Sequence, residues 1–179
     1  MKKLSKKNIV NRIGILGGTF DPPHKGHLYI SKIAIKKLKL NKLVWAITKK
    51  NPLKKTPFLK IKTRIILSKK ITRNEKKIFV KYFENKIKSK NTFNLINYIK
   101  KNKNIKLFFL MGADNLKKFH KWNNWKKIPK LAKVVVFPRN GYSMNSLDKI
   151  ASKKLNKKDF MYINSKKINI SSSLIRKFW

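Results

Sequence analysis

Residues 17–27, GGTFDPPHKGH, combine side chains that could hold a phosphorylated ligand. Gly17 and Gly18 let the backbone turn sharply and approach a phosphate group closely. His24 and His27 are three residues apart, so at the start of a helix they lie on one face. Because a helix N-terminus also offers free N–H groups and partial positive charge, the segment predicts a polyphosphate pocket.

The spacing of this segment excludes two common phosphate-binding loops. It lacks the GxxxxGK[ST] pattern of the P-loop and the GxGxxG pattern of dinucleotide-binding folds. The alternative interpretation is a tight turn between a strand and a helix, with two histidines on the surface.

A second segment, ISSSLIR at residues 170–176, could supply further phosphate ligands. Its serines can cap a helix while their hydroxyl and backbone N–H groups meet phosphate oxygens. Arg176 follows Ser172 by four residues, so its guanidinium can reach the same anion. Taken alone, the segment would equally suit an ordinary capped helix.

Hydrophobic patterning predicts the elements that position these segments. Apolar runs predict strands at 12–16, 43–48, 77–83, 107–111, 132–137 and 160–164. Apolar residues at helical spacing predict helices at 26–39, 62–73, 91–103, 114–128 (as one or two short helices), 145–155 and 172–178. In the helix at 62–73 we expect Ile65, Ile66 and Leu67 to face the core.

This alternation of strands and helices predicts an α/β fold with a Rossmann-like, doubly wound and mainly parallel sheet. Residues 17–27 would then lie at the carboxyl edge of the sheet, where such folds bind ligands. We expect a single domain over residues 1–179, with 1–11 as a basic N-terminal extension.

Composition excludes several classes of protein. The chain has 179 residues, of which 41% are hydrophobic, too many for a disordered polycation. It has no cysteine, so a disulfide framework, a thiolate zinc site and a cysteine nucleophile are excluded. No apolar run suits a transmembrane helix, and the basic N-terminus lacks the apolar region of a signal peptide. We therefore expect a cytoplasmic protein without a membrane partner.

The net charge of +42 admits two interpretations. One is a drift of codon composition, and the other is a selected function in binding polyanions. Only five of the 48 basic residues are arginine, and the lysines are spread along the chain, which disfavours sequence-specific binding of nucleic acid. We expect weak, unspecific binding of polyanions and attraction of small anions. The sequence does not determine the oligomeric state.

Residues 17–27 resemble the first signature of the nucleotidyltransferases with an (H/T)xGH motif. Residues 170–176 resemble their second signature, ISSTxIR, with Ser173 where threonine is common. The resemblance implies that His24, His27 and Arg176 are catalytic and hold the triphosphate of ATP. It also implies ATP contacts from the loop and helix-start residues Gly17, Gly18, Thr19, Phe20, Ser171, Ser172 and Ser173.

Residues 111–125, MGADNLKKFHKWNNW, resemble the GxDxxxxFxxW region of nicotinate-nucleotide adenylyltransferases. In that family a tryptophan matching Trp122 stacks on the pyridine ring, and the residue matching Asp114 lies in the nucleotide site. An aromatic face suits a planar pyridinium through stacking and cation–π attraction. Gly112 would bring backbone N–H groups close to the nicotinate carboxylate. Trp125 suits a core position equally well, and His120 suits a structural role better than a catalytic one.

Three further stretches resemble the same family more loosely. Asn51-Pro52-Leu53-Lys54, with Trp45, resembles its W…NPxK stretch, which implies that Lys54 binds the mononucleotide phosphate. A solvated surface lysine is the alternative. Residues 136–142 resemble a loop ending in R-x-G-Y, which implies a ligand contact for Arg139.

The third stretch, residues 91–95, matches a T-x-[DN]-T-L helix start and implies a substrate contact for Thr92, although Leu95 replaces a second threonine. Arg64 falls where the family has a helix arginine, and a structural role suits it equally.

The resemblance implies that the chain transfers the adenylyl group of ATP to nicotinate mononucleotide, by in-line attack on the α-phosphorus. The products would be nicotinate adenine dinucleotide, a precursor in NAD biosynthesis, and pyrophosphate. Mg²⁺ would bridge phosphates of ATP rather than occupy a protein metal site. Alternatives are sister enzymes acting on nicotinamide mononucleotide or phosphopantetheine, and a polyanion-binding protein with a vestigial nucleotide site.

Overall fold

The computed structural model describes residues 10–51, 53, 55–101, 104–138, 159–165 and 170–179. The helix predicted at 145–155 lies outside these residues, as do Lys54 and Arg139.

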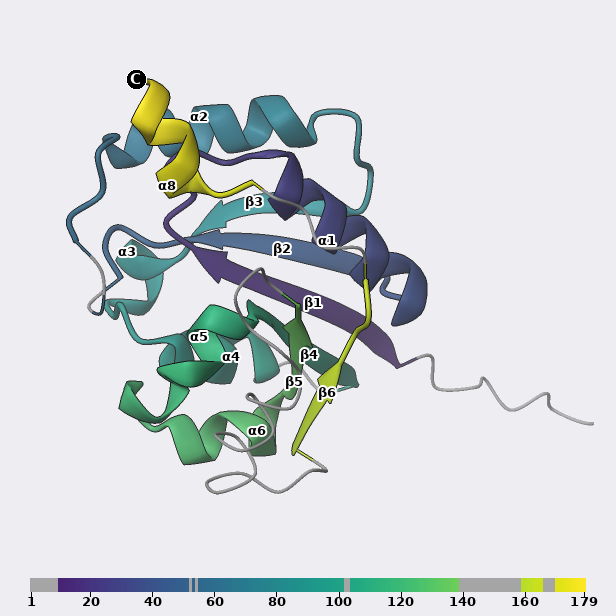
Figure 1. Cartoon of the computed structure of the whole chain (residues 1–179). Coiled ribbons are helices and arrows are strands. Elements are labelled where there is room, and N and C mark those ends of the chain that lie inside the picture. The colour runs from purple at the N-terminus through teal and green to yellow at the C-terminus, as the bar shows by residue number, and fades with distance from the viewer. Residues whose placement is uncertain (1–9, 52, 54, 102–103, 139–158, 166–169) are drawn as a thin grey trace, which may run out of the picture.

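Six strands form one sheet in the order β3-β2-β1-β4-β5-β6 (Figure 1). The strands are β1 (Asn11–Gly18), β2 (Lys42–Ile47), β3 (Ile78–Tyr82), β4 (Ile105–Gly112), β5 (Lys133–Phe137) and β6 (Phe160–Tyr162). Every pairing among these strands is parallel, which confirms the expected Rossmann-like fold. The strand order reverses between β1 and β4, so their carboxyl ends flank the crevice where such sheets bind ligands.

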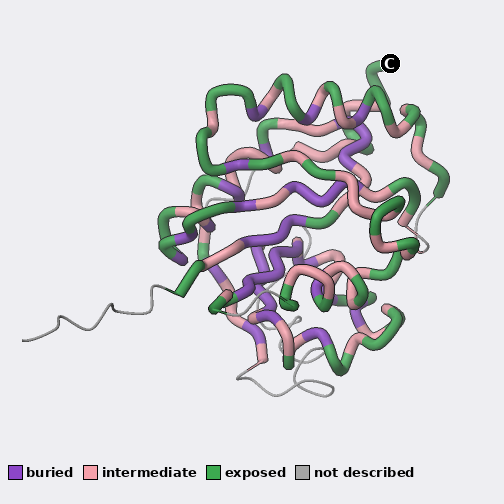
Figure 2. The backbone as a smooth tube through the Cα atoms, turned by 180° about the vertical axis from the view of Figure 1, so that it is seen from behind, coloured by how far each residue is buried: buried purple, intermediate pink, exposed green. Residues whose placement is uncertain are grey.

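The central strands bury both of their faces. Leu107 and Phe109 of β4 pack beneath α4 (Thr92–Lys100), α5 (Ala113–Lys117) and α6 (Ile128–Leu131), on one face. Phe108 and Leu110 pack beneath α1 (Lys25–Lys37) and α2 (Ile61–Thr72), on the other. Successive side chains of a strand point to opposite faces, so a strand covered on both faces is apolar throughout. Figure 2 shows this buried band along the middle of the sheet.

Helix α2 differs from the prediction in the side that it turns inward. The side chain of Ile66 is 64% exposed, whereas Arg64, Ser68 and Thr72 are buried. These three polar residues are four apart and therefore share one face of the helix. The prediction that Ile66 faces the core was wrong, because α2 packs through Ile61, Ile65 and Ile71 and directs a polar face towards neighbouring loops.

Short helical segments complete the carboxyl side of the sheet. The helix α3 (Glu84–Ile87), which the sequence did not predict, follows β3. The region predicted as one or two helices at 114–128 consists of α5, two 3-10 turns (Phe119–Lys121 and Trp125–Lys127) and the start of α6. At the C-terminus, α8 (Ser172–Ile175) and a 3-10 turn (Arg176–Phe178) lead to Trp179, whose ring lies 6.1 Å from that of Phe58, shortly before α2. Within the described ranges, no helix has the length and apolar character needed to cross a membrane.

Candidate active site

Two cavities open at the carboxyl edge of the sheet and share a floor. The first, of about 430 Å³, contains His24 and His27 and is called the histidine cavity here. The second, of about 290 Å³, contains Trp122 and is called the tryptophan cavity. The residues that line both come from the ends of β1 and β4 and from α5: Gly17, Gly18, Thr19, Met111 and Asn115.

The two histidines form a compact pair at the start of α1. Their ring centroids are 3.8 Å apart. The backbone N–H of Gly26 donates to Nδ1 of His24 (3.1 Å), and the backbone N–H of His24 donates to Nδ1 of His27 (3.2 Å). Because each Nδ1 accepts a hydrogen bond, the neutral rings carry their proton on Nε2. Each imidazole therefore presents an N–H donor suited to an anion.

Two buried aromatic rings pack against His27 of this pair. Phe20, with a φ of 49°, stacks on Trp45 and lies 4.8 Å from the ring of His27. The indole N–H of Trp45 donates to the hydroxyl of Ser31 on α1 (2.8 Å). A positive φ is costly for a residue with a side chain, so this loop conformation is maintained by the surrounding packing.

Asp21 joins three separate parts of the chain. Its carboxylate is buried and accepts the backbone N–H groups of Phe58 and Leu59, both at 2.8 Å. Nη1 of Arg176 lies 3.4 Å from the same carboxylate and also donates to the backbone carbonyl of Asp21. Asp21 therefore holds Arg176 at the wall of the histidine cavity, although the two residues are 155 positions apart.

The C-terminal serines attach their segment to the glycine-rich loop. Ser172 donates to the backbone carbonyl of Pro22 (2.8 Å), and Ser173 accepts from Nη2 of Arg176 (3.3 Å). Ser171 caps α8 by accepting the backbone N–H of Leu174 (3.1 Å). The segment thereby closes one side of the histidine cavity.

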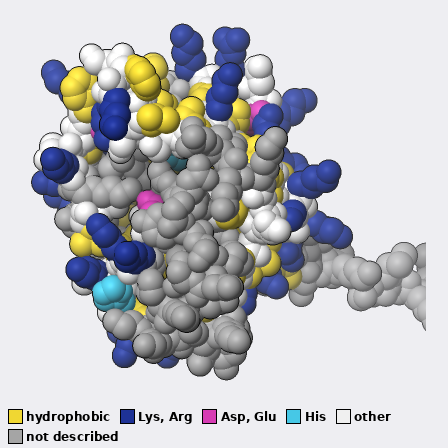
Figure 3. Space-filling model, in the orientation of Figure 1, with side chains coloured by type: hydrophobic (Ala, Val, Ile, Leu, Met, Phe, Trp, Pro, Cys, Tyr) yellow, Lys and Arg dark blue, Asp and Glu magenta, His cyan; other side chains and the backbone are white. Residues whose placement is uncertain are grey.

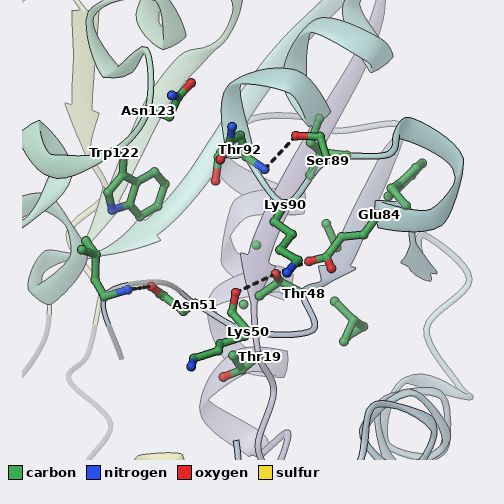
Figure 4. A pocket seen from close by; sticks show the side chains of 18 of the residues that line it. Thr19, Thr48, Lys50, Asn51, Glu84, Ser89, Lys90, Thr92, Trp122 and Asn123 are labelled. Carbon is green, nitrogen blue, oxygen red and sulfur yellow. Dashed lines mark hydrogen bonds between the residues drawn. The ribbon is translucent and has the colours of Figure 1, made fainter. Parts of the chain in front are cut away.

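The tryptophan cavity has an aromatic wall and a polar wall. The ring of Trp122 packs edge-on against Phe109 and Phe119, which fixes its orientation. Thr92, at the start of α4, and Lys90 lie on other walls of the same cavity (Figure 4). An aromatic face combined with hydroxyl and ammonium donors suits a flat ring that carries an acidic substituent.

Glu84 fixes the loop that follows β2 at the edge of this cavity (Figure 4). Its carboxylate accepts the hydroxyl of Thr48 and the backbone N–H of Lys49 (3.0 Å). The hydroxyl of Tyr82 also donates to it (3.3 Å). Burial raises the pKa of Tyr82, and the negative charge of Glu84 raises the pKa further.

The cavities favour anionic ligands. Lysines line both of them: the tryptophan cavity has Lys50, Lys90 and Lys121, and the histidine cavity has Lys55. Their described acidic residues are Asp21 and Glu84, and both are engaged by hydrogen-bond donors of the protein. Lysine and arginine side chains are spread over the visible described surface rather than gathered into one stripe (Figure 3).

Comparison with known proteins identifies the family. The cytidylyltransferase-like family matches residues 15–178. The chain is 51% identical over 166 residues to a Pelagibacter ubique protein named as a probable nicotinate-nucleotide adenylyltransferase, covering 93% of this chain and 92% of that protein. A Rhizobium meliloti protein of the same name is 37% identical over 134 residues, which cover 74% and 71% of the two chains. The chain belongs to the nicotinate-nucleotide adenylyltransferase family.

Solved structures share the fold of this adenylyltransferase family. The Plasmodium falciparum nicotinic acid mononucleotide adenylyltransferase complexed with NaAD superposes with a TM-score of 0.76 and is 23% identical in sequence. The alignment covers 94% of this chain and 83% of that one. A second structure of the Plasmodium enzyme, complexed with APC, gives a TM-score of 0.74.

The structure brings together most of the residues expected for an adenylyltransferase. The histidine cavity is lined by Gly17, Gly18, Thr19, Phe20, His24, His27, Ser172, Ser173 and Arg176. Thr92 and Trp122 line the tryptophan cavity. Gly112, which we expected near the nicotinate carboxylate, lines the histidine cavity.

Two of the expected site residues do not line either cavity in the described structure. Ser171 acts as the cap of α8, and Asp114 lies in the first turn of α5.

Sequence reasoning missed three residues of this site. They are Asp21, Glu84 and Asn115. One feature of the sequence could have drawn attention to Asp21 and Glu84: the chain has only six acidic residues, so each of them is unusual. Asn115 had no such signal, because its position between the two cavities depends on the packing of α5 against the sheet.

Proposed function

We propose that this chain transfers the adenylyl group of ATP to nicotinate mononucleotide, forming nicotinate adenine dinucleotide and pyrophosphate in NAD biosynthesis. The 5′-phosphate oxygen of the mononucleotide forms a bond to the α-phosphorus of ATP. The bond from that phosphorus to the bridging oxygen of the β-phosphate breaks, and the electron pair leaves with pyrophosphate. One observation carries the proposal: a cavity with two imidazoles and an arginine shares its floor with a cavity that has an aromatic wall.

The histidine cavity is the site proposed for the triphosphate. The Nε2–H groups of His24 and His27 and the guanidinium of Arg176 would donate to phosphate oxygens and stabilise the developing charge. Ser172 and Ser173 support this arrangement through the short C-terminal helix. Because the nucleophile is a phosphate of the substrate, the protein's task is alignment and charge stabilisation.

The tryptophan cavity is the site proposed for the nicotinate ring. Trp122 would stack on the ring, and Thr92 would donate to its carboxylate from the start of α4. The neighbouring lysines add positive potential, which favours the acid over the neutral amide. Lys54 and Arg139 remain candidates for further substrate contacts.

The donor set of the histidine cavity suits a Mg²⁺ ion that arrives with ATP. Asp21 is the carboxylate among its described lining residues, and two backbone N–H groups and Arg176 already engage it. Phosphate oxygens are therefore the ligands available to the ion, which would neutralise their charge.

The test is pyrophosphate release with Mg²⁺ and ATP, comparing nicotinate mononucleotide with nicotinamide mononucleotide. We expect release with the acid and little with the amide. Equal release would contradict the account of the tryptophan cavity and indicate a dual-specificity enzyme. No release with either substrate would contradict the proposed function. Binding of RNA that persists at physiological salt would then favour a polyanion-binding protein.

A further inference from the structure

Arg64 is buried where three loops meet. Its side chain lies on the polar face of α2 and is 2% exposed. Nη1 donates to the backbone carbonyls of Thr19 (2.6 Å) and Thr48 (2.7 Å). Nη2 donates to the carbonyl of Lys49 (2.9 Å), and Nε donates to the carbonyl of Leu59 (3.0 Å). One guanidinium therefore connects the loop after β1, the loop after β2 and the segment that precedes α2.

Two of the carbonyls that Arg64 binds belong to residues that line the cavities. Thr19 lies on their shared floor, and Thr48 lines the tryptophan cavity. Leu59 donates its backbone N–H to Asp21, which holds Arg176 at the histidine cavity. Arg64 therefore links residues of both cavities, although it is not itself among the described residues that line them.

The chemistry of this position requires arginine. A guanidinium is planar and has five N–H donors in a fixed fork, whereas a lysine has one compact ammonium group. Burial lowers the pKa of Arg64, and the carboxylates of Asp21 and Glu84 oppose that shift. Burying a cation costs free energy compared with burying an apolar side chain. The gain that offsets this cost must come from the hydrogen bonds by which Arg64 connects the loops.

We propose that Arg64 is a positioning residue that fixes the spacing between the histidine cavity and the tryptophan cavity, and so the alignment of the two substrates. The proposal rests on the proposed function, because it assumes that one substrate occupies each cavity. Arg64 does not touch the reacting atoms; it acts through the carbonyls of Thr19 and Thr48.

The test compares Arg64→Lys with a matched control, Arg12→Lys. Arg12 also donates from Nε to a backbone carbonyl, that of Leu38 (2.7 Å), and lies over the ring of Phe108. It lies at the amino end of β1, whereas the cavities open at the carboxyl ends of the strands. Arg12 makes one such guanidinium hydrogen bond and Arg64 makes four, so the control tests the loss of an arginine outside the site. Only Arg64→Lys should loosen the loops at the carboxyl edge.

The measurements are kcat and the separate affinities for ATP, nicotinate mononucleotide and nicotinate adenine dinucleotide, on protein held well below its melting temperature. Misalignment by about 1 Å can cost about 10²-fold in rate, so we expect a loss of that order in kcat for Arg64→Lys. The dinucleotide spans both cavities, and its affinity should fall far more than the affinity for either single substrate. Arg12→Lys should lower the melting temperature and leave kcat and all three affinities near wild-type values.

Two results would overturn the proposal. In one, Arg64→Lys lowers the affinities for the three ligands by the same factor, as a general loss of folded protein would. In the other, its kcat equals that of Arg12→Lys. Arg64→Gln, which keeps two N–H donors, provides a second variant if the lysine variant does not fold. Failure of the wild-type protein to bind the dinucleotide would overturn the proposed function itself, and the spacing proposal with it.

Discussion

The histidine cavity and the tryptophan cavity share a floor, yet they are assembled differently. The histidine cavity takes most of its polar groups from two continuous segments, 17–27 and 170–176. The tryptophan cavity takes its walls from the ends of three strands, the loop after β2, the helices α3, α4 and α5, and residues 121–123. Groups within one short segment keep their geometry through local hydrogen bonds, whereas groups from many segments need tertiary connections such as those of Glu84 and Arg64.

The largest expected effect lies in the histidine cavity. His27→Ala removes one of the N–H donors that we propose for the triphosphate, and losing such a donor typically costs about 10²–10³ in rate. The measurement is kcat for pyrophosphate release, together with thermal melting. His120→Ala is the matched control, because His120 lies in a 3-10 turn outside the described lining of both cavities. Near wild-type kcat in folded His27→Ala would refute the role of His27.

A smaller effect is expected in the tryptophan cavity. Stacking on an aromatic side chain contributes about 1–3 kcal/mol per base, so Trp122→Ala should raise the KM for nicotinate mononucleotide by about 5- to 150-fold. The KM for ATP should stay near its wild-type value, since Trp122 does not line the histidine cavity in the described structure.

Trp122→Phe should recover much of the loss, because phenylalanine keeps an aromatic face. Equal increases in both KM values would show that Trp122 supports the whole site rather than the tryptophan cavity.

The smallest of these effects concerns the connection between the glycine-rich loop and the C-terminus. Asp21→Asn keeps one oxygen acceptor but removes the charge that faces Arg176. Hydrogen bonds to charged groups contribute about 1.5–3 kcal/mol, so the melting temperature should fall. The KM for ATP should rise several-fold, while the KM for the mononucleotide should change little.

Asp159→Asn provides the matched control, since Asp159 directly precedes β6 and lies outside the described lining of both cavities. A lower melting temperature with an unchanged KM for ATP would limit Asp21 to a purely structural role.

The sequence predicted much of this architecture because the relevant signals are local. A fully apolar run such as LFFLM requires cover on both faces, which identifies a central strand of a doubly wound sheet. The pairing of His24 with His27 follows from their spacing at a helix start. Helix α2 misled the same reasoning, since its hydrophobic spacing concealed a buried polar face at Arg64, Ser68 and Thr72.

The sequence by itself therefore determined the local motifs most completely. It determined least which distant residues meet in the folded chain. It specified the fold class, the glycine-rich loop, the histidine pair and the family resemblance. Only the tertiary structure decided that Arg176 meets Asp21 and that Arg64 joins the walls of two cavities. The physical reason is that the partners of Arg64 are backbone carbonyls, which nearly every position offers. No pattern of side chains can mark a carbonyl as a partner, and only folding brings the chosen ones together.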